Sequence, residues 1–336
     1  MIALAPVKIA LVYNEASGRG RGAAAAAAVE SAAAGAGHSV VRVPVRSAGI
    51  DDALHAADVA VVAGGDGTVH SLLPRLVRSA AAIYHFPLGT ENLFARQFRM
   101  NRDLPRLLGA LEGGRVVRVD VPRLRIEETA AAGNGDGKTA AQETPFVLMC
   151  SVGPDASVVR RLAKVRTGPI SHLSYALPIL GELCDPYLPR ITVRVDGAEI
   201  VNNTRGMAII ANSRQYATRI DPAARASMHD GLLDVVFFPC RHALAAGAWL
   251  LSSRLRRHTR NKHLVYAQGA RVELVAEGEG TPAYQVDGEA GRECAAPLRL
   301  SMSFGDERVA QQLRVLLPAE GLGVNAGIET EPLTAR

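Results

Sequence analysis

A buried strand that runs into a cluster of glycines constrains this chain more than any other feature. Residues 61–68 read Val-Val-Ala-Gly-Gly-Asp-Gly-Thr, and apolar residues at helical spacing follow over 68–79. Glycines let main-chain N–H groups approach an anion closely, and a helix start adds unpaired donors and the positive end of its dipole. The junction therefore indicates a phosphate site at Gly64, Gly65, Gly67 and Thr68.

Asp66 narrows that interpretation. A carboxylate inside a phosphate-binding turn would repel the phosphates unless a divalent cation lay between them. The pattern thus predicts Mg²⁺ with a nucleotide rather than a bare nucleotide. A plain strand–turn–helix junction also favours Gly and Asp, but it does not require three glycines around one acid.

A second segment, residues 86–98, repeats the arrangement with a short apolar run, a turn at Gly89-Thr90 and a helix start that includes Asn92. The carboxyl ends of neighbouring parallel strands meet at one edge of a sheet, and open α/β sheets bind ligands there. Both glycine turns are therefore expected at that edge.

The pattern of elements predicts two domains. From residue 7 to about 118, apolar strands alternate with Ala- and Leu-rich helices, which is typical of a parallel sheet covered on both faces. From about 119, short strands with fewer helices between them favour a mostly antiparallel domain. The first part has predicted strands at 8–13, 39–43, 58–63 and 82–86 and helices at 21–35, 68–79, 91–98 and 103–112. The second has strands at 119–126, 145–152, 191–196, 206–211, 232–238 and 271–276 and helices at 155–165 and 171–182.

Gly-Gly-Asp-Gly-Thr at 64–68 and Pro-Leu-Gly-Thr-x-Asn-x-x-Ala-Arg at 87–96 resemble the catalytic domain of the diacylglycerol kinase family. That family includes bacterial soluble lipid kinases and relatives of sphingosine and ceramide kinases, with NAD kinases and phosphofructokinases more distant. The resemblance implies an α/β nucleotide-binding lobe with a parallel sheet, a second, mostly antiparallel β-rich lobe, and an active site in the cleft between the lobes.

The predicted boundaries follow from both arguments. Residues 1–118 form the nucleotide-binding domain, which 304–318 could complete, and 119–303 form the lipid-acceptor domain. Residues 127–144 lack an apolar period and are expected to be a flexible loop, and 319–336 are expected to be a mobile tail.

The end of the first strand, Tyr-Asn-Glu-Ala-Ser-Gly-Arg-Gly at 13–20, resembles the family's Asn-Pro-x-Ser-Gly-x-Gly loop, with Glu15 in place of the proline. The resemblance implies that Asn14, Ser17 and Gly18 contact the nucleotide, although such a loop is also ordinary before a helix. Ser47 stands after the second strand, where the family has a Thr-rich motif, and we expect it to make that contact.

Asp287-Gly288-Glu289 offers two carboxylates. In an extended chain residues two apart face the same side, so one carboxylate could hold Mg²⁺ while the other accepts a proton. Such a triplet is also typical of a hairpin turn. The family carries Asp-Gly-Glu at this point with the glutamate as proton acceptor, which implies that role for Glu289, with Asp287 and Asp66 as further catalytic residues.

Two further matches lie between these motifs. Residues 151–158 resemble the family's Gly-x-Asp-Ala-x-Val element at a helix start that lines the cleft, although Asp155 could simply cap the helix. Residues 222–235 resemble a stretch that binds a structural Mg²⁺ in some bacterial members. The resemblance implies Ser227, Asp230 and Leu232 as ligands, although a turn aspartate is more often a cap.

The chain departs from the family at several positions. Glu91 adds a carboxylate and Leu93 removes one within the second glycine motif, and Arg219 stands where a glycine cluster is expected. Basic residues also gather over 254–262, after Trp249-Leu250-Leu251. Such a segment could rest on an anionic bilayer, or it could be a solvated helix end whose cations complement the helix dipole.

Composition adds few constraints. The 336 residues carry 38 Lys and Arg against 33 Asp and Glu, a net charge of +5 that suits anionic partners in general. We find no signal-peptide pattern and no apolar stretch of the ~20 residues that a spanning helix needs. The four cysteines lie far apart without metal-ligand spacing, which favours reduced thiols in the cytoplasm.

These features together predict an ATP- and Mg²⁺-dependent lipid kinase that phosphorylates the hydroxyl of diacylglycerol or a related lipid. The expected partner is a lipid at a membrane surface, met by a cytoplasmic protein at the inner face, with no nucleic acid; a homodimer is left open. A kinase of a soluble acceptor, as in NAD kinases, is one alternative. The changed loops at Glu91 and Arg219 motivate another, a catalytically silent nucleotide-binding regulator.

Overall fold

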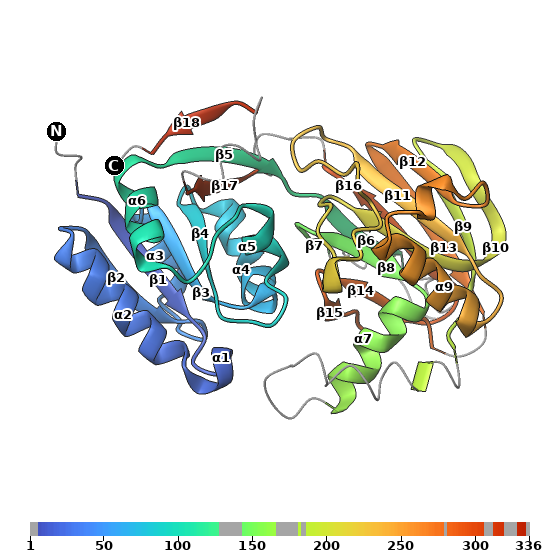
Figure 1. The fold of residues 1–336 in the computed structure, drawn as a ribbon, viewed down its shortest axis with the longest axis horizontal. Helices are drawn as coiled ribbons and strands as arrows, with labels where there is room; N and C mark the ends of the chain where they lie inside the picture. The colour runs from blue at the N-terminus through green and yellow to red at the C-terminus, as the bar shows by residue number, and fades with distance from the viewer. Residues whose placement is uncertain are drawn as a thin grey trace, which may run out of the picture. The chain divides into compact units, whose positions relative to one another are not determined.

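The structure is a computed structural model, and its chain divides into two compact units (Figure 1). It describes residues 6–127, 143–165, 181–182, 186–278, 281–305, 312–318 and 328–333. Unit 1 holds the described residues up to Asp120 and those after 311, and unit 2 holds those from Val121 to 305. Each unit has its own sheet and its own core.

Unit 1 is built on a seven-stranded sheet in the order β18-β5-β17-β4-β3-β1-β2. Its strands are β1 (Lys8–Tyr13), β2 (Ser39–Pro44), β3 (Val59–Gly64), β4 (Ala82–Pro87), β5 (Arg115–Asp120), β17 (Gln312–Leu317) and β18 (Thr330–Pro332). The first four are parallel, which confirms the predicted α/β lobe. Every residue of β3 and β4 is buried, as expected for strands covered on both faces.

Helices cover both faces of this sheet. The connections from β1 to β2 and from β2 to β3 run in opposite directions, so right-handed crossovers place the helices α2 and α3 on opposite faces. The helices are α1 (Ser17–Gly20), α2 (Gly22–Gly35), α3 (Ile50–Ala56), α4 (Asp66–Arg78), α5 (Leu93–Gln97) and α6 (Leu104–Gly113). On α4, residues Val69, Leu72, Leu73 and Leu76 are buried at the spacing of one helix face.

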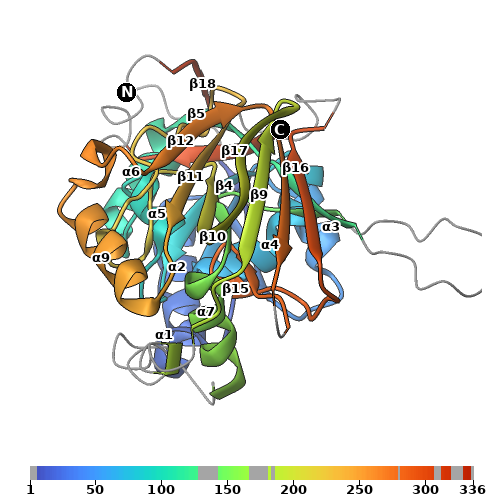
Figure 2. The same ribbon diagram turned by 90° about the vertical axis from the view of Figure 1, so that its right-hand side faces the viewer.

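Unit 2 is a large antiparallel sheet, which confirms the predicted β-rich second lobe (Figure 2). Its main path runs β15-β14-β8-β10-β9-β13-β16-β6-β7, and β11 pairs with β10 and β12. The strands are β6 (Arg123–Glu127), β7 (Glu143–Pro145), β8 (Met149–Val152), β9 (Arg190–Val195), β10 (Ala198–Ala211), β11 (Leu233–Pro239), β12 (Val265–Gly269), β13 (Arg271–Glu277), β14 (Tyr284–Val286), β15 (Glu289–Ala290) and β16 (Leu298–Ser303). Between the strands lie the helices α7 (Pro154–Val165) and α9 (Ala243–Arg254) and the short 3-10 turns η2 (Ala217–Arg219) and η3 (His258–Arg260).

Some elements differ from the sequence prediction. The strand expected at 119–126 is divided between β5 of unit 1 and β6 of unit 2, because Val121-Pro122 interrupts the ladder where the chain passes between units. The flexible loop expected at 127–144 lies outside the described residues except at its ends, and so does the helix expected at 171–182. The flanking strands β6 and β7 pair with each other.

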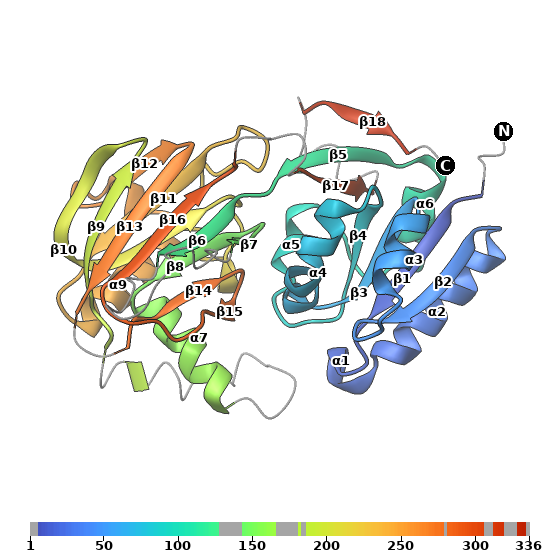
Figure 3. The ribbon, with the colours of Figure 1, turned by 180° about the vertical axis from the view of Figure 1, so that it is seen from behind.

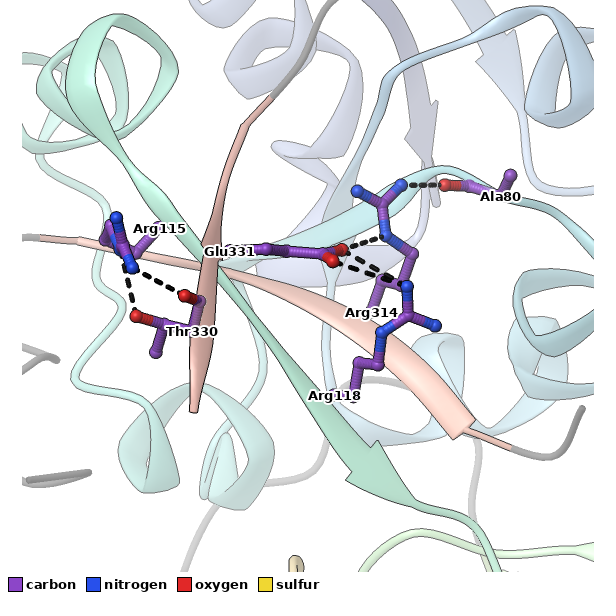
Figure 4. Close-up of polar contacts among 6 residues, drawn as sticks. All are labelled: Ala80, Arg115, Arg118, Arg314, Thr330 and Glu331. Carbon is purple, nitrogen blue, oxygen red and sulfur yellow. Dashed lines mark hydrogen bonds and ion pairs between the residues drawn. The ribbon is translucent and has the colours of Figure 1, made fainter. Parts of the chain in front are cut away.

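The C-terminal strand β18 differs from the prediction of a mobile tail over 319–336. It pairs antiparallel with β5, which lies between β18 and β17 (Figure 3). Arg115 Nε donates to Thr330 Oγ1 at 2.9 Å, and Glu331 accepts from Arg314 Nε at 3.1 Å and from Arg118 (Figure 4). Thr330, Glu331 and Pro332 show no apolar period, so cross-strand pairing and arginine contacts hold this strand instead.

Candidate active site

Turns at the carboxyl ends of β3 and β4 lie together at one edge of the sheet of unit 1. The two strands pair in parallel without a register shift, and Leu88 N–H donates to Gly64 O at 2.7 Å across the turns. The Gly64–Thr68 turn and the turn at 89–92 are therefore neighbours, as the sequence predicted.

Gly65 and Gly89 lie so close together that neither has room for a side chain. A Cβ atom on Gly89 would lie 2.8 Å from the Cα of Gly65, and one on Gly65 would lie 3.2 Å from the Cα of Gly89. The colliding atoms belong to the backbone and cannot rotate away. This edge is therefore bare main chain, which lets N–H groups come close to a bound anion.

Asp66 joins the same two turns through its side chain. Its Oδ2 accepts from Leu93 N–H at 2.9 Å, and its Oδ1 accepts from Phe94 N–H at 3.1 Å. These donors stand in the first turn of α5, where N–H groups have no partner inside the helix. Asp66 thus caps α5, a role that the sequence did not predict, and each oxygen keeps a lone pair for a further ligand.

Asn92 fixes the exposed loop around Gly89. Its Oδ1 accepts from Gly89 N–H at 2.9 Å, while its Nδ2 donates to Gly89 O at 2.8 Å. Asn92 has a φ of 49°, a left-handed conformation that asparagine tolerates. Thr90 is exposed beside it, and Leu93 is buried in the core of the unit. The departure from the family at Leu93 therefore serves packing.

The loop after β1 reaches the same edge. Asn14 Nδ2 donates to Thr68 Oγ1 at 3.3 Å, and Asn14 N–H donates to Ala63 O at 3.1 Å. Ser17 N–H donates to Asn14 O at 3.0 Å. Asn14 therefore anchors the loop that carries Ser17 and Gly18, the other two residues expected to contact the nucleotide. Gly18 has a φ of 63°, and a Cβ atom there would lie 3.6 Å from Leu88.

Ser47 follows β2, the next strand along the sheet, and is half-buried. Its Oγ accepts from Gly49 N–H at 3.3 Å, which is a local turn contact before α3. Since β2 is parallel to β1, this turn lies at the same carboxyl edge as Asn14.

His85 supports the first glycine turn from inside the sheet. It is fully buried on β4, and its Nε2–H donates to Gly64 O at 3.0 Å. Burial lowers the pKa of His85, an effect that exceeds the opposing influence of the Asp66 charge and of the bond to Gly64. His85 is therefore neutral, and it was missed from the sequence because it lies within an apolar run.

Asp287 occupies a turn, and this differs from the sequence argument. Val286 pairs with Glu289, so Asp287 and Gly288 form a two-residue hairpin turn with φ values of 51° and 86°. The Asp287 carboxylate is buried and accepts main-chain bonds at 2.9, 2.8 and 3.0 Å from Val147, Leu148 and Met149. The two carboxylates therefore do not share one face of an extended strand, and Asp287 fastens this hairpin to β8.

A polar network joins the hairpin to the start of α7. Gln285 accepts from Gly288 N–H at 2.8 Å and donates to Ser151 Oγ at 3.0 Å. Ser151 in turn donates to Asp155 Oδ2 at 2.5 Å. The Gly-Pro-Asp and Asp-Gly-Glu motifs are therefore neighbours in unit 2. Sequence reasoning missed Ser151 and Gln285, whose only signal is a polar residue within a buried strand.

Glu289 begins β15 at the end of this hairpin and is half-buried. No hydrogen bond or ion pair holds its carboxylate among the described residues, in contrast to Asp287. An unengaged carboxylate on a fixed hairpin suits proton transfer better than one that accepts three main-chain bonds.

The three expected metal ligands at 227–232 lie in one loop of unit 2. Asp230 is exposed, and its Oδ1 accepts from Leu232 N–H at 3.0 Å, while Ser227 Oγ accepts from His229 N–H at 3.4 Å. These are local turn contacts, and the metal site stays a prediction. Arg219 is exposed with a φ of 58°, a conformation that the expected glycine would adopt more easily.

The residues of unit 1 fit a magnesium nucleotide better than a closed cage for a metal ion. Among the described residues, no three His, Cys, Asp or Glu side chains gather closely enough to hold a metal ion. In sites that transfer phosphoryl groups, Mg²⁺ is usually held by one or two carboxylates together with phosphates and waters. Asp66, beside the bare edge of Gly65 and Gly89, offers one such carboxylate.

Comparisons with known proteins agree with this arrangement. The family model described as the diacylglycerol kinase catalytic domain matches residues 8–124, and the YegS C-terminal NAD kinase beta sandwich-like domain matches residues 148–316. The chain is 27% identical over 283 residues to a probable lipid kinase YegS-like protein of Klebsiella pneumoniae (strain 342). The aligned residues cover 81% of this chain and 82% of that protein.

Solved structures share the fold. A putative diacylglycerol kinase from Bacillus anthracis str. Sterne gives a TM-score of 0.64 at 15% identity over 93% of this chain and 98% of its own. The structure of yeast NADH kinase complexed with NADH gives a TM-score of 0.52 at 10% identity, over 96% of this chain and 90% of the yeast chain. Both domain matches and the glycine edge lead to one conclusion: the chain belongs to the diacylglycerol kinase catalytic-domain family, with a second domain of the YegS C-terminal type.

Proposed function

We propose that this protein is an ATP- and Mg²⁺-dependent lipid kinase that phosphorylates the hydroxyl of diacylglycerol or a related lipid at a membrane surface. The observation that carries the proposal is the close approach of Gly65 and Gly89, where there is no room for a side chain between the two turns at the carboxyl edge of the sheet. Among the described residues, no acceptor takes the N–H groups of Asp66 and Gly67 at the start of α4. Such donors suit phosphate groups.

The candidate residues of each unit have distinct tasks in this proposal. ATP with Mg²⁺ supplies the phosphoryl group and neutralises its charge. The N–H donors of the glycine turns hold the phosphates, Asp66 holds the cation while it orders the turn at 89–92, and Asn14 with Ser17 and Gly18 flank the nucleotide. Glu289 accepts the proton of the lipid hydroxyl, and Asp287 keeps its hairpin in place.

Membership in a kinase family supports phosphoryl transfer, and the acceptor is the part that needs an experiment. The protein is incubated with Mg²⁺ and labelled ATP over separate micelles of diacylglycerol, sphingosine, ceramide, phosphatidylglycerol and phosphatidylinositol, with NAD as a soluble acceptor. We expect label in a lipid and its loss in Glu289→Gln. Glu293→Gln, an exposed glutamate four residues on, is the matched control and keeps activity.

Two other results would replace the proposal. Label in NAD without label in any lipid would favour a kinase of a soluble acceptor, the activity named for the yeast NADH kinase. ATP binding without transfer to any acceptor, unchanged by Glu289→Gln, would favour a nucleotide-binding regulator.

A further inference from the structure

Helix α9 of unit 2 is apolar on both sides. Its inner side carries Ala246, Trp249 and Ser253, which are buried and spaced three and four residues apart. Trp249 Nε1 donates to Pro239 O at 2.9 Å, and its ring lies 5.3 Å from that of Phe238. These contacts fix which side of the helix faces the sheet.

The opposite side exposes three leucines, which we call the outer stripe: Leu244, Leu251 and Leu255. They are 77%, 61% and 56% exposed, and only one other large hydrophobic residue among those described, Val41, is similarly exposed. At about 100° per residue, spacings of seven and four place the three leucines within about 40° of one another. The stripe therefore points about 170° away from the buried side. Figure 2 shows α9 in orange at the margin of unit 2.

A set of cations accompanies the outer stripe. Residues 241–264 contain six Lys and Arg and no Asp or Glu, and we call these six the basic cluster: Arg241, Arg254, Arg256, Arg257, Arg260 and Lys262. All six are exposed, and none forms an ion pair with a described residue. The cluster is therefore an uncompensated positive charge next to an uncovered apolar surface.

The end of α9 is built so that the cations stay beside the stripe. Arg257 N–H donates to Ser252 O at 2.8 Å and Arg256 N–H to Ser253 O at 2.9 Å, with a φ of 53° at Arg256. This is the hydrogen-bond pattern that closes helices at glycine, adopted here by an arginine. His258 then anchors the chain, because it is buried and its Nε2 lies 2.8 Å from Pro222 O.

We propose that the outer stripe and the basic cluster dock on the surface of an anionic lipid bilayer. A helix that is apolar all round is ordinarily buried, so the outer stripe calls for an apolar medium. The uncompensated cations favour a bilayer whose surface is negatively charged. Apolar burial and charge attraction add at a membrane surface, where each Lys or Arg strengthens binding about fivefold. The inference deepens the proposed function, which has the lipid acceptor at a membrane surface, by naming the part of this chain that meets the bilayer.

Docking is tested with the full chain and without nucleotide. Vesicles of phosphatidylcholine alone and vesicles that also contain phosphatidylglycerol are sedimented with the protein. We expect at least tenfold tighter binding to the anionic vesicles and a loss of that preference at high salt. The combined change Arg254→Gln, Arg256→Gln and Arg257→Gln removes the preference, while Arg102→Gln with Arg271→Gln and Arg299→Gln, three exposed arginines elsewhere, keeps it.

The outer stripe is tested by changing its three leucines to serine, with thermal unfolding as the check of folding. This variant should bind either vesicle at least tenfold more weakly. Equal binding by the leucine variant would overturn the proposal.

Two outcomes separate this inference from its rivals. If the unaltered protein forms dimers in solution that the leucine variant does not form, the outer stripe is a contact between two copies and the proposal fails. If no lipid is ever phosphorylated but vesicle binding follows the predicted pattern, the docking surface stands and the kinase proposal fails.

Discussion

Asp66 Oδ2 accepts a hydrogen bond from the main-chain N–H of Leu93 at 2.9 Å, and this bond ties the first glycine turn to the second. Asp66→Asn keeps the shape of the side chain but turns an amide donor toward one of two N–H groups. We expect kcat/KM for lipid phosphorylation to fall at least about 100-fold, because the turn at 89–92 shifts. The free energy of unfolding should fall by about 2 kcal/mol. Asp52→Asn, an exposed change on α3, is the control and should alter neither quantity. An inactive variant with full stability would mean that Asp66 acts only on the ligand.

Gly89→Ala tests the bare edge of the sheet. The added methyl group would lie 2.8 Å from Gly65 Cα and 2.9 Å from Asn92 Oδ1, so the two turns must separate. We expect a loss of stability of about 1–3 kcal/mol and no measurable ATP binding by calorimetry. Gly109→Ala on α6 is the matched control, because a Cβ atom there meets nothing within 4 Å. That change should raise stability by up to about 1 kcal/mol and leave ATP binding intact. Normal nucleotide affinity in Gly89→Ala would show that the phosphates bind elsewhere.

The two acids of the Asp-Gly-Glu hairpin should separate stability from catalysis. Asp287→Asn leaves the main-chain N–H of Val147 without its acceptor in a buried place, so the free energy of unfolding should fall by about 2 kcal/mol. Glu289→Gln breaks no bond to a described residue and should change stability by less than about 0.5 kcal/mol. It should, however, reduce lipid phosphorylation about 10²- to 10⁴-fold. Denaturant titration and initial rates measure the two effects, and a reversed pattern would contradict the assignment of the proton acceptor.

These acids also show how far sequence reasoning reaches. The edge formed by Gly64–Thr68 and Gly89 was predictable, because strand pattern and glycine spacing are local and parallel pairing brings the turns together. The position of Asp287 was not, because its three donors lie about 140 residues earlier in the chain. The sequence Asp-Gly-Glu is also compatible with either a two-residue turn or an extended strand.

Contacts between residues far apart in the chain also explain why the sequence did not predict strand β18 or the exposed side of α9. Strand β18 has only the residues Thr330–Pro332, and its stability comes from β5 and from arginines more than 200 residues away in the chain. The sequence indicated an apolar segment before the basic residues over 254–262, but it did not indicate which side of α9 is exposed. Leucines at helical spacing indicate a buried face, and only the structure shows that Trp249 already occupies the buried side.

The buried His85 makes the stability of the protein depend on pH. Burial lowers the pKa of His85 in the folded protein. Near pH 6.5 the histidine therefore binds a proton in the unfolded chain but stays neutral in the folded protein. Stability is therefore complete above about pH 6.5 and falls as the pH decreases below it, by up to about 1.4 kcal/mol per pH unit. His85→Gln can still donate to Gly64 O and should flatten this part of the profile. His55→Gln, an exposed histidine on α3, should leave the profile unchanged. Urea unfolding at pH 7.5, 6.5 and 5.5 measures the slope as the difference between these variants. An acid-induced loss of the same size in all three proteins would place the titrating group outside the core of unit 1.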